Sequence, residues 1–196
     1  MRLICSAAQR KANALAHYFT ADTHFGDDCV RQFFGRPFSS AEQMDQVMIE
    51  RFGDLSPSDD LWIVGDFADC RDAARQENAC RAFDCLPGRK HLIRGNHDPD
   101  WVRELGWASV HDLVELEIAG RPFVLCHYPL LTWNGVQDGA VHLFGHVHTS
   151  WAGAGGQVNV GVDLWDFRPV SSTEAEIAAL QREPTRIHQR LTGHAF

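Results

Sequence analysis

Short apolar segments recur along the chain, and most of them have the length of a β-strand. Residues 61–64, Leu-Trp-Ile-Val, contain no polar side chain, which is typical of a strand buried on both faces. Residues 114–118 alternate between apolar and acidic side chains, which predicts a strand with one exposed face. We predict the complete set of strands at residues 15–20, 61–64, 91–93, 114–118, 123–126, 141–144 and 157–162, with a hairpin between the fourth and the fifth.

The segments between these strands are more polar, and several have a helical pattern. Ser39 and Glu42 match a capping box, and the apolar residues between 44 and 52 are spaced along one face of a helix. Residues 26–38 predict a loop. Further helices are predicted at residues 72–83, after the Asp98-Pro99 cap, and from a cap at Ser172 or Thr173 to about Arg182. Strands alternate with helices first and form hairpins later, so we expect an α/β fold, a mixed-sheet β-sandwich flanked by helices.

The length and the apolar content predict one domain. The chain has 196 residues, of which 44% are hydrophobic and 22% charged, as in an ordinary protein with a core. Residues 1–14 precede the first strand and predict an N-terminal extension, which leaves residues 15–196 as the single domain. No apolar run reaches the roughly 20 residues that span a bilayer, and the N-terminus lacks a secretory pattern, so we expect a soluble, cytoplasmic protein.

The spacing of the cysteines and the net charge exclude some kinds of site and of partner. None of the six cysteines forms a C-x-x-C pair, which argues against a zinc knuckle, a redox motif or a disulfide framework. The formal net charge of −8 argues against a broad basic surface for nucleic acid. A phosphate substrate is still compatible with this charge, because two divalent cations would reverse the local field.

Polar residues that suit metal binding follow five of the predicted strands. Ligands in open α/β folds bind at the carboxyl ends of the strands. In an extended segment residues i and i+2 face the same side, so Asp22 and His24 could reach one ion, and His146 and His148 repeat that spacing. The complete set of strand-end clusters is Asp22-Thr23-His24, Gly65-Asp66, Gly95-Asn96-His97-Asp98, His127 and Gly145-His146-Val147-His148.

Each cluster alone has an ordinary explanation. An aspartate after a strand is usually a turn residue or a helix cap, and H-x-H is a common sequence. Five such clusters in this order, three of them with a glycine that permits close approach, favour a metal site.

The clusters together resemble the signature of the calcineurin-like metallophosphoesterases, from about Tyr18 to His148. Two further segments, residues 126–134 and 159–170, are similar to a small bacterial phosphoesterase or phosphohydrolase branch. The resemblance implies a four-layer α/β/β/α fold and two divalent metal ions. It implies that Asp22, His24, Asp66 and His148 hold one ion, that Asp66, Asn96, His127 and His146 hold the other, and that Asp66 bridges them. Ligands without a thiolate suit manganese, iron, nickel or zinc.

The same resemblance implies hydrolysis of a phosphomonoester or phosphodiester by a metal-bridging hydroxide. His97 would act as general acid or phosphate donor, oriented by Asp69 or by Asp98. Arg94 is the main candidate for a phosphate contact, because guanidinium matches phosphate geometry, and Arg36 is an alternative. Asn134, together with Trp133, is predicted to line the substrate pocket.

Two other functions use the same residues. A nuclease or a nucleotide phosphodiesterase would share the site, although the acidic balance and the short loops argue against a long nucleic-acid groove. A non-catalytic metal-binding interaction protein is the other alternative, and the presence of all seven ligands and His97 argues against it. The expected partner is therefore a small phosphorylated substrate rather than a membrane, and the sequence does not indicate an oligomeric state.

Overall fold

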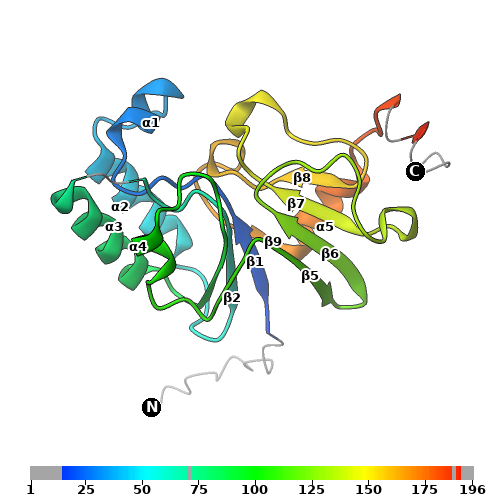
Figure 1. Ribbon diagram of the computed structural model, residues 1–196, viewed down its shortest axis with the longest axis horizontal. Helices are drawn as coiled ribbons and strands as arrows, with labels where there is room; N and C mark the ends of the chain where they lie inside the picture. Colours follow the sequence, from blue (N-terminus) through cyan, green and yellow to red (C-terminus); the bar gives the residue numbers. More distant parts are fainter. Residues whose placement is uncertain (1–14, 70–71, 187–188, 191–196) are drawn as a thin grey trace, which may run out of the picture.

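A computed structural model describes residues 15–69, 72–186 and 189–190, and the predicted N-terminal extension, residues 1–14, lies outside them. The described chain forms two β-sheets with helices around them (Figure 1). Both sheets contain parallel and antiparallel strands. The predicted α/β class, with two mixed sheets flanked by helices, is therefore confirmed.

The first sheet has the strand order β4-β3-β2-β1-β9. Four of its strands run parallel, and β9 pairs antiparallel with β1. Every residue of β2 is buried, as the apolar run at 61–64 predicted, and the strand begins one residue earlier, at Asp60. The strands are β1 (His17–Thr20), β2 (Asp60–Val64), β3 (Arg89–Ile93), β4 (Ser109–His111) and β9 (Val170–Ser171).

The second sheet has the strand order β5-β6-β7-β8. The predicted hairpin is confirmed, because β5 and β6 pair antiparallel from Leu113↔Cys126 to Ile118↔Arg121. The next two strands are parallel to β6. The strands are β5 (Leu113–Ile118), β6 (Arg121–Cys126), β7 (Val141–Phe144) and β8 (Gln157–Asn159).

Most helices lie on one side of the first sheet, and the second sheet packs on its other side (Figure 1). Helix α5 differs, because it contacts β1 and β9 of the first sheet and β7 and β8 of the second. On the outer face of the second sheet, Trp133 and Val136 pack against Val124. The helices are α1 (Asp28–Phe33), α2 (Ala41–Phe52), α3 (Ala73–Cys85), α4 (Asp100–Arg103) and α5 (Ser172–Leu180), and the 3₁₀ turns are η1 (Val136–Asp138), η2 (His148–Ser150) and η3 (Val162–Leu164).

The core between the two sheets is apolar and tightly closed. Phe19 of β1 stacks on Phe123 of β6, with ring centroids 5.7 Å apart. Val64 and Ile93 of the first sheet belong to the same buried cluster as Leu143 of the second. This core holds the two sheets face to face, so the loops at the carboxyl ends of their strands come together at one edge.

Several predicted boundaries were wrong for local reasons. The N-cap of α2 is Ser40, which accepts a hydrogen bond from the Gln43 N–H, and not Ser39. The capping box of α5 begins at Ser171, because Glu174 bonds back to that residue. The predicted loop at 26–38 contains α1, capped by Asp27, and strands β4 and β9 were missed because they are short. No helix in the described ranges has the length and apolarity to cross a membrane.

Candidate metal centre

Loops from both sheets meet at the carboxyl ends of β1, β2, β3, β6 and β7. The backbone holds them together: the Asp22 N–H donates to the Gly65 carbonyl at 3.0 Å, and the Gly145 N–H donates to the His127 carbonyl at 3.0 Å. The Asp22 Oδ1 atom accepts from the His146 N–H at 2.9 Å, which joins the first loop to the loop after β7. The strand-end clusters of the sequence therefore converge on one place.

The backbone of these loops is bent sharply at the polar residues. Five of them have a left-handed φ, a conformation that residues other than glycine adopt at an energetic cost and that often marks a functional site. The values are 55° at Asp22, 49° at His24, 57° at Asp66, 71° at His146 and 47° at His148. The sequence argument from an extended i, i+2 spacing was therefore wrong for both pairs, because these residues lie in tight turns after the strands.

The side chains gather into two groups, each able to hold a metal ion. In each group the potential ligand atoms lie within 4.8 Å of one another. His146 and His148 belong to different groups, although they are two residues apart. We call Asp22, His24 and His148 the inner group, because all three are buried, and Asp66, His127 and His146 the outer group, because His146 is exposed.

Asp66 is a member of the outer group whose carboxylate also faces the inner group. Its Oδ2 atom is 3.6 Å from Nε2 of His24 and 3.3 Å from Nε2 of His127. Burial alone would raise the pKa of Asp66, but the hydrogen bond and the charge of His127 outweigh it and hold the pKa at about 2. Asp66 is thus an ionised carboxylate that faces ligands of both groups.

The inner group contains buried polar atoms that a cation would satisfy. Both ring nitrogens of His24 and the Oδ2 atom of Asp22 have no hydrogen-bond partner within the described part of the chain. Burial raises the pKa of Asp22 to about 6 and lowers the pKa of His24 to about 3, so the histidine is neutral and carries a free lone pair. Unsatisfied buried groups are costly, and a divalent cation bound by neutral imidazole and carboxylate removes the cost.

The outer group places several acceptors around one point. Nδ1 of His127 is 2.9 Å from the Val64 carbonyl and donates to it, which leaves Nε2 as the free ring nitrogen. That nitrogen lies 3.2 Å from Oδ1 of Asn96 and close to Asp66. Burial lowers the pKa of His127, but Asp66 and Asp22 raise it above the ordinary value overall. A cation would satisfy these three atoms together, so Asn96 could join the outer group.

An ion pair that the sequence did not reveal holds the inner group. Oδ2 of Asp163 lies 2.8 Å from Nδ1 of His148, and both oxygens of Asp163 accept hydrogen bonds from Arg36, at 2.7 and 2.9 Å. Arg36 also donates to the carbonyls of Asp22 and Thr23 and is 4% exposed. The alternative of Arg36 as a phosphate contact was therefore wrong, because its guanidinium is buried and fully used.

Asn159 and Asp163 stood in the sequence segment that resembled the bacterial branch, but no role could be assigned to them. The Asn159 side chain donates to the carbonyls of His148 and Trp151 and accepts from the Gly161 N–H. Together with Asp163 it fixes the loop that carries His148. The available signal in the sequence was the spacing N-x-x-x-D, which begins at the last residue of β8.

Glycines beside the groups leave no room for a side chain. A Cβ on Gly95 would lie 2.1 Å from Oδ1 and 2.3 Å from the backbone N of Asp66. A Cβ on Gly65 would lie 2.2 Å from Nδ1 of His127, and one on Gly161 would lie 2.6 Å from Oδ2 of Asp22. The close approach that the glycines indicated in the sequence is therefore confirmed, with Gly161 as an addition.

His97 stands beside the two groups and is exposed. Its Nδ1 lies 3.0 Å from Oδ2 of Asp69, and its backbone N–H donates to Asp66. Asp98 contacts backbone only, accepting from the N–H groups of Asp66, Phe67 and Gly95. Asp69 is therefore the carboxylate that could orient His97, and the predicted catalytic role of Asp98 is not favoured, because its carboxylate joins two loops.

An open pocket of about 590 Å³ adjoins the two groups. Neither predicted substrate contact lines it: Arg94 forms an ion pair with Asp112, and the amide of Asn134 donates to Glu115 at 2.8 Å. Trp133 is buried in the outer cluster of the second sheet. The residues that line the pocket are His24, Asp27, Cys29, Val30, Phe33, Phe34, Asp66, Asp69, Arg75, His97, His146 and His148.

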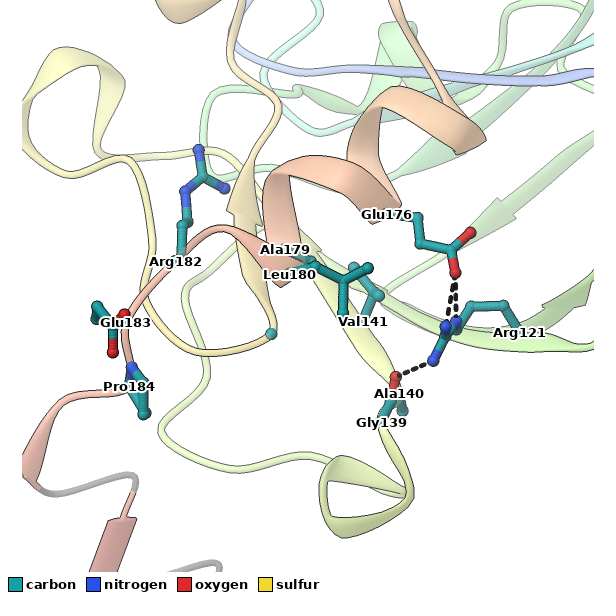
Figure 2. Close-up of a pocket in the computed structure, with 11 residues that line it drawn as sticks. Arg121, Gly139, Ala140, Val141, Glu176, Ala179, Leu180, Arg182, Glu183 and Pro184 are labelled. Atoms are coloured by element: carbon teal, nitrogen blue, oxygen red, sulfur yellow. Dashed lines mark hydrogen bonds and ion pairs between the residues drawn. The ribbon is translucent and has the colours of Figure 1, made fainter. Parts of the chain in front are cut away.

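A second, smaller cavity of about 160 Å³ lies beside α5 and has no part in this chemistry. Figure 2 shows Arg121 of this cavity joined to Glu176 and to the Gly139 carbonyl. Arg182 donates to the Gln157 carbonyl at 2.9 Å. The ring of His142 also has hydrogen-bond partners on both nitrogens, because Nδ1 contacts the Val124 carbonyl and Nε2 accepts from the Leu130 N–H.

Comparison with known proteins places this geometry in a family. Residues 18–153 match the family model described as calcineurin-like phosphoesterase, a span that contains every residue of both groups. The chain belongs to the calcineurin-like phosphoesterase family. It is therefore a metal-dependent phosphoester hydrolase, and the resemblance drawn from the sequence is confirmed. The family implies divalent metal ions, and the unsatisfied atoms of the inner group fit them.

Two relatives are similar over most of the chain. An uncharacterized protein from Methanocaldococcus jannaschii is 26% identical over 162 residues, which cover 79% of this chain and 85% of that protein. The crystal structure of a protein of unknown function from Aquifex aeolicus superposes with a TM-score of 0.68 at 24% identity, covering 84% of this chain and 99% of that one. The second similarity confirms the fold.

Proposed function

We propose that this calcineurin-like phosphoesterase hydrolyses a small phosphomonoester or phosphodiester at a dinuclear metal site. The observation that carries the proposal is the position of Asp66, whose Oδ2 atom lies between His24 of the inner group and His127 of the outer group. A carboxylate that faces two groups of ligands is suited to bridge two cations. The unpartnered atoms of Asp22 and His24 support the same assignment.

Seven side chains would hold the two ions. The inner ion would bind Asp22, His24, His148 and the shared Asp66, and the outer ion would bind Asp66, Asn96, His127 and His146. Because these donors are oxygen and imidazole nitrogen, manganese, iron, nickel and zinc all suit them. When bound, two divalent cations lower the pKa of a water to give a nucleophile near neutral pH and neutralise charge on the phosphoryl oxygens.

Side chains of the protein would supply the proton that the leaving group needs. Asp69 accepts a hydrogen bond from Nδ1 of His97 and fixes the ring, so Nε2 is the atom that donates a proton to the departing oxygen or a hydrogen bond to the phosphate. His97 is 47% exposed in its side chain and lines the pocket, so a substrate can reach it.

The charge of the pocket supports an anionic substrate only when cations are present. Three carboxylates line it, from Asp27, Asp66 and Asp69, and they would repel a phosphate. Two divalent cations reverse that field. A small substrate also agrees with the net charge of −8, which does not favour a long nucleic-acid strand.

The test is a substrate panel with metal-reconstituted protein. Phosphomonoesters, cyclic nucleotides, dinucleotides and nucleic acids are compared, with chelator-treated protein and Asp66→Asn as controls. We expect turnover of a small ester that both controls abolish. Equal activity of Asp66→Asn and the wild type would refute the two-metal mechanism. Faster turnover of single-stranded DNA than of any small ester would favour a nuclease instead.

A further inference from the structure

One wall of the pocket is built from α1, and the packing of this helix is unusual. No residue of α1 is buried. Its apolar side chains do not enter the core: Val30 and Phe33 line the pocket, as does Phe34 directly after the helix. Apolar side chains on a short helix normally face the core. Here they face the space in which a substrate would lie.

Phe33 is the most exposed large apolar residue of the described chain, with 83% of its surface accessible. Its ring packs edge-on against Phe34, with centroids 4.9 Å apart. Phe34 in turn stacks on His148 of the inner group at 3.6 Å and an interplanar angle of 16°. A continuous series of rings therefore leads from the metal-binding histidines to an aromatic face that is open to solvent.

The loop geometry fixes α1 close to the metal groups. Asp27 caps the helix by accepting from the Cys29 N–H at 2.8 Å, and its own N–H donates to the His24 carbonyl. Arg31 in the last turn donates to the Phe38 carbonyl at 2.8 Å. The aromatic wall is thus attached to the turn that carries His24.

The pocket has room for more than a phosphate and contains one permanent cation. Its volume of about 590 Å³ lies within the roughly 300–1,000 Å³ of sites for small organic ligands. Among the described lining residues Arg75 is the only arginine or lysine. It pairs with Asp72 at 3.1 Å, and both side chains are about half exposed, so the guanidinium can still bind an anion.

We propose that the substrate is a nucleotide, whose base stacks on Phe33 and whose phosphate is contacted by Arg75. This inference rests on the proposed function, because it names the substrate of the same site. A flat ring is the group that matches an exposed phenyl face beside a phosphate site, since aromatic faces prefer offset stacking. The acidic net charge favours a free nucleotide over a nucleic-acid strand.

Binding to the metal-loaded protein tests the proposal without turnover. The probes are the 5′-methylenephosphonate analogues of adenosine monophosphate and of ribose 5-phosphate, which differ only in the base. Calorimetry should give a dissociation constant about tenfold lower, or more, for the base-bearing probe, as stacking contributions of this size imply. A difference below threefold would overturn the proposal.

Four variants separate the contribution of Phe33 to base binding from that of Arg75 to phosphate binding. Phe33→Ala should reduce the base preference to below threefold, and Phe33→Trp should restore it. Arg75→Gln should weaken both probes by the same factor, about fivefold, because it removes a phosphate contact. Ile177→Ala, an exposed apolar residue on α5, should match the wild type for both probes. A preference that survives in Phe33→Ala, or unchanged affinities in Arg75→Gln, would refute the assignment of that residue.

A separate turnover assay distinguishes this inference from the proposed function. Hydrolysis of p-nitrophenyl phosphate or bis(p-nitrophenyl) phosphate without a base preference in binding would refute the nucleotide and leave the phosphoesterase mechanism intact. A base preference in a protein that hydrolyses no ester would refute the mechanism and retain the nucleotide site.

Discussion

The inner and outer metal-binding groups have the same kinds of side chain but different surroundings. All members of the inner group, Asp22, His24 and His148, are buried, whereas the outer group ends at the exposed His146. The exposed Asn96 approaches His127 of the outer group, whereas the exposed His97 packs edge-on against His24 of the inner group. Both groups contribute to the pocket lining, and the outer group has the one exposed member, His146.

The two groups are also held by different interactions. His148 of the inner group is fixed by Asp163, which is in turn paired with the buried Arg36. His127 of the outer group is fixed by a single backbone carbonyl, that of Val64. A buried ion pair fails when one partner is removed, whereas a backbone carbonyl cannot be removed by substitution. The inner group should therefore be the one whose geometry depends on distant side chains.

The largest expected effect comes from removing the carboxylate that faces both groups. Asp66→Asn should lower kcat/KM by about 10³-fold, because one substitution weakens two sites and the Lewis acidity they support. Asp22→Asn should weaken only the inner group. Metal content measured by inductively coupled plasma spectrometry should fall below one ion per chain in Asp66→Asn and to about one in Asp22→Asn. Equal stoichiometry in both variants would contradict the shared position of Asp66.

The next effect concerns the exposed histidine that stands beside the two groups, His97. His97→Ala should reduce kcat by about 10²-fold, the lower part of the range for a general acid, with two ions still bound. Asp69→Asn should reduce kcat about tenfold, because the ring loses its orienting partner and keeps its proton-donating atom. The measurements are steady-state kinetics on an ester with a poor leaving group and metal analysis. Loss of metal from His97→Ala would show that this residue is a ligand.

A third prediction tests the support of the inner group. Asp163→Ala should weaken binding of the inner ion by about 10- to 100-fold, the usual effect of losing the partner of a ligating histidine. It should also lower the free energy of unfolding by about 3–5 kcal/mol, because Arg36 stays buried without a counter-charge. Denaturant unfolding and metal titration measure the two quantities. Arg36→Met in the same background should recover part of the stability, and its failure to do so would argue against an uncompensated charge.

The smallest expected effect concerns packing at the glycines. Gly95→Ala should lower the free energy of unfolding by about 1–3 kcal/mol, because its Cβ would overlap the backbone of Asp66. Gly106→Ala is the matched control, since the nearest atom to its Cβ is 3.8 Å away, at Phe83. Thermal unfolding of the two variants decides the matter. A control variant that unfolds as early as Gly95→Ala would contradict the overlap with Asp66 as the cause of the loss, because Gly→Ala by itself lowers the entropy of the unfolded chain and does not destabilise.

The strands and the ligand residues were largely predictable because they depend on local patterns. The apolar run at 61–64 and the alternation at 114–118 both formed the expected strands. By contrast α1 was predicted as a loop, since a six-residue helix without a buried face has no periodic signal. The roles of Asp98 and Asp163 were also unpredictable, because an aspartate at a loop has the same local sequence whether it caps, bridges or ligates.

The sequence by itself determined which side chains stand at the strand ends, because the alternation of apolar strands with polar turns is encoded over a few residues at a time. The family resemblance, and not the local pattern, assigned His146 and His148 to different sets of ligands with Asp66 shared, and the packing of the loops gives this arrangement. Only the tertiary structure placed Arg36 on Asp163, 127 residues away. Such partners are chosen by the packing of two sheets against each other, and no local pattern records which loops that packing brings together.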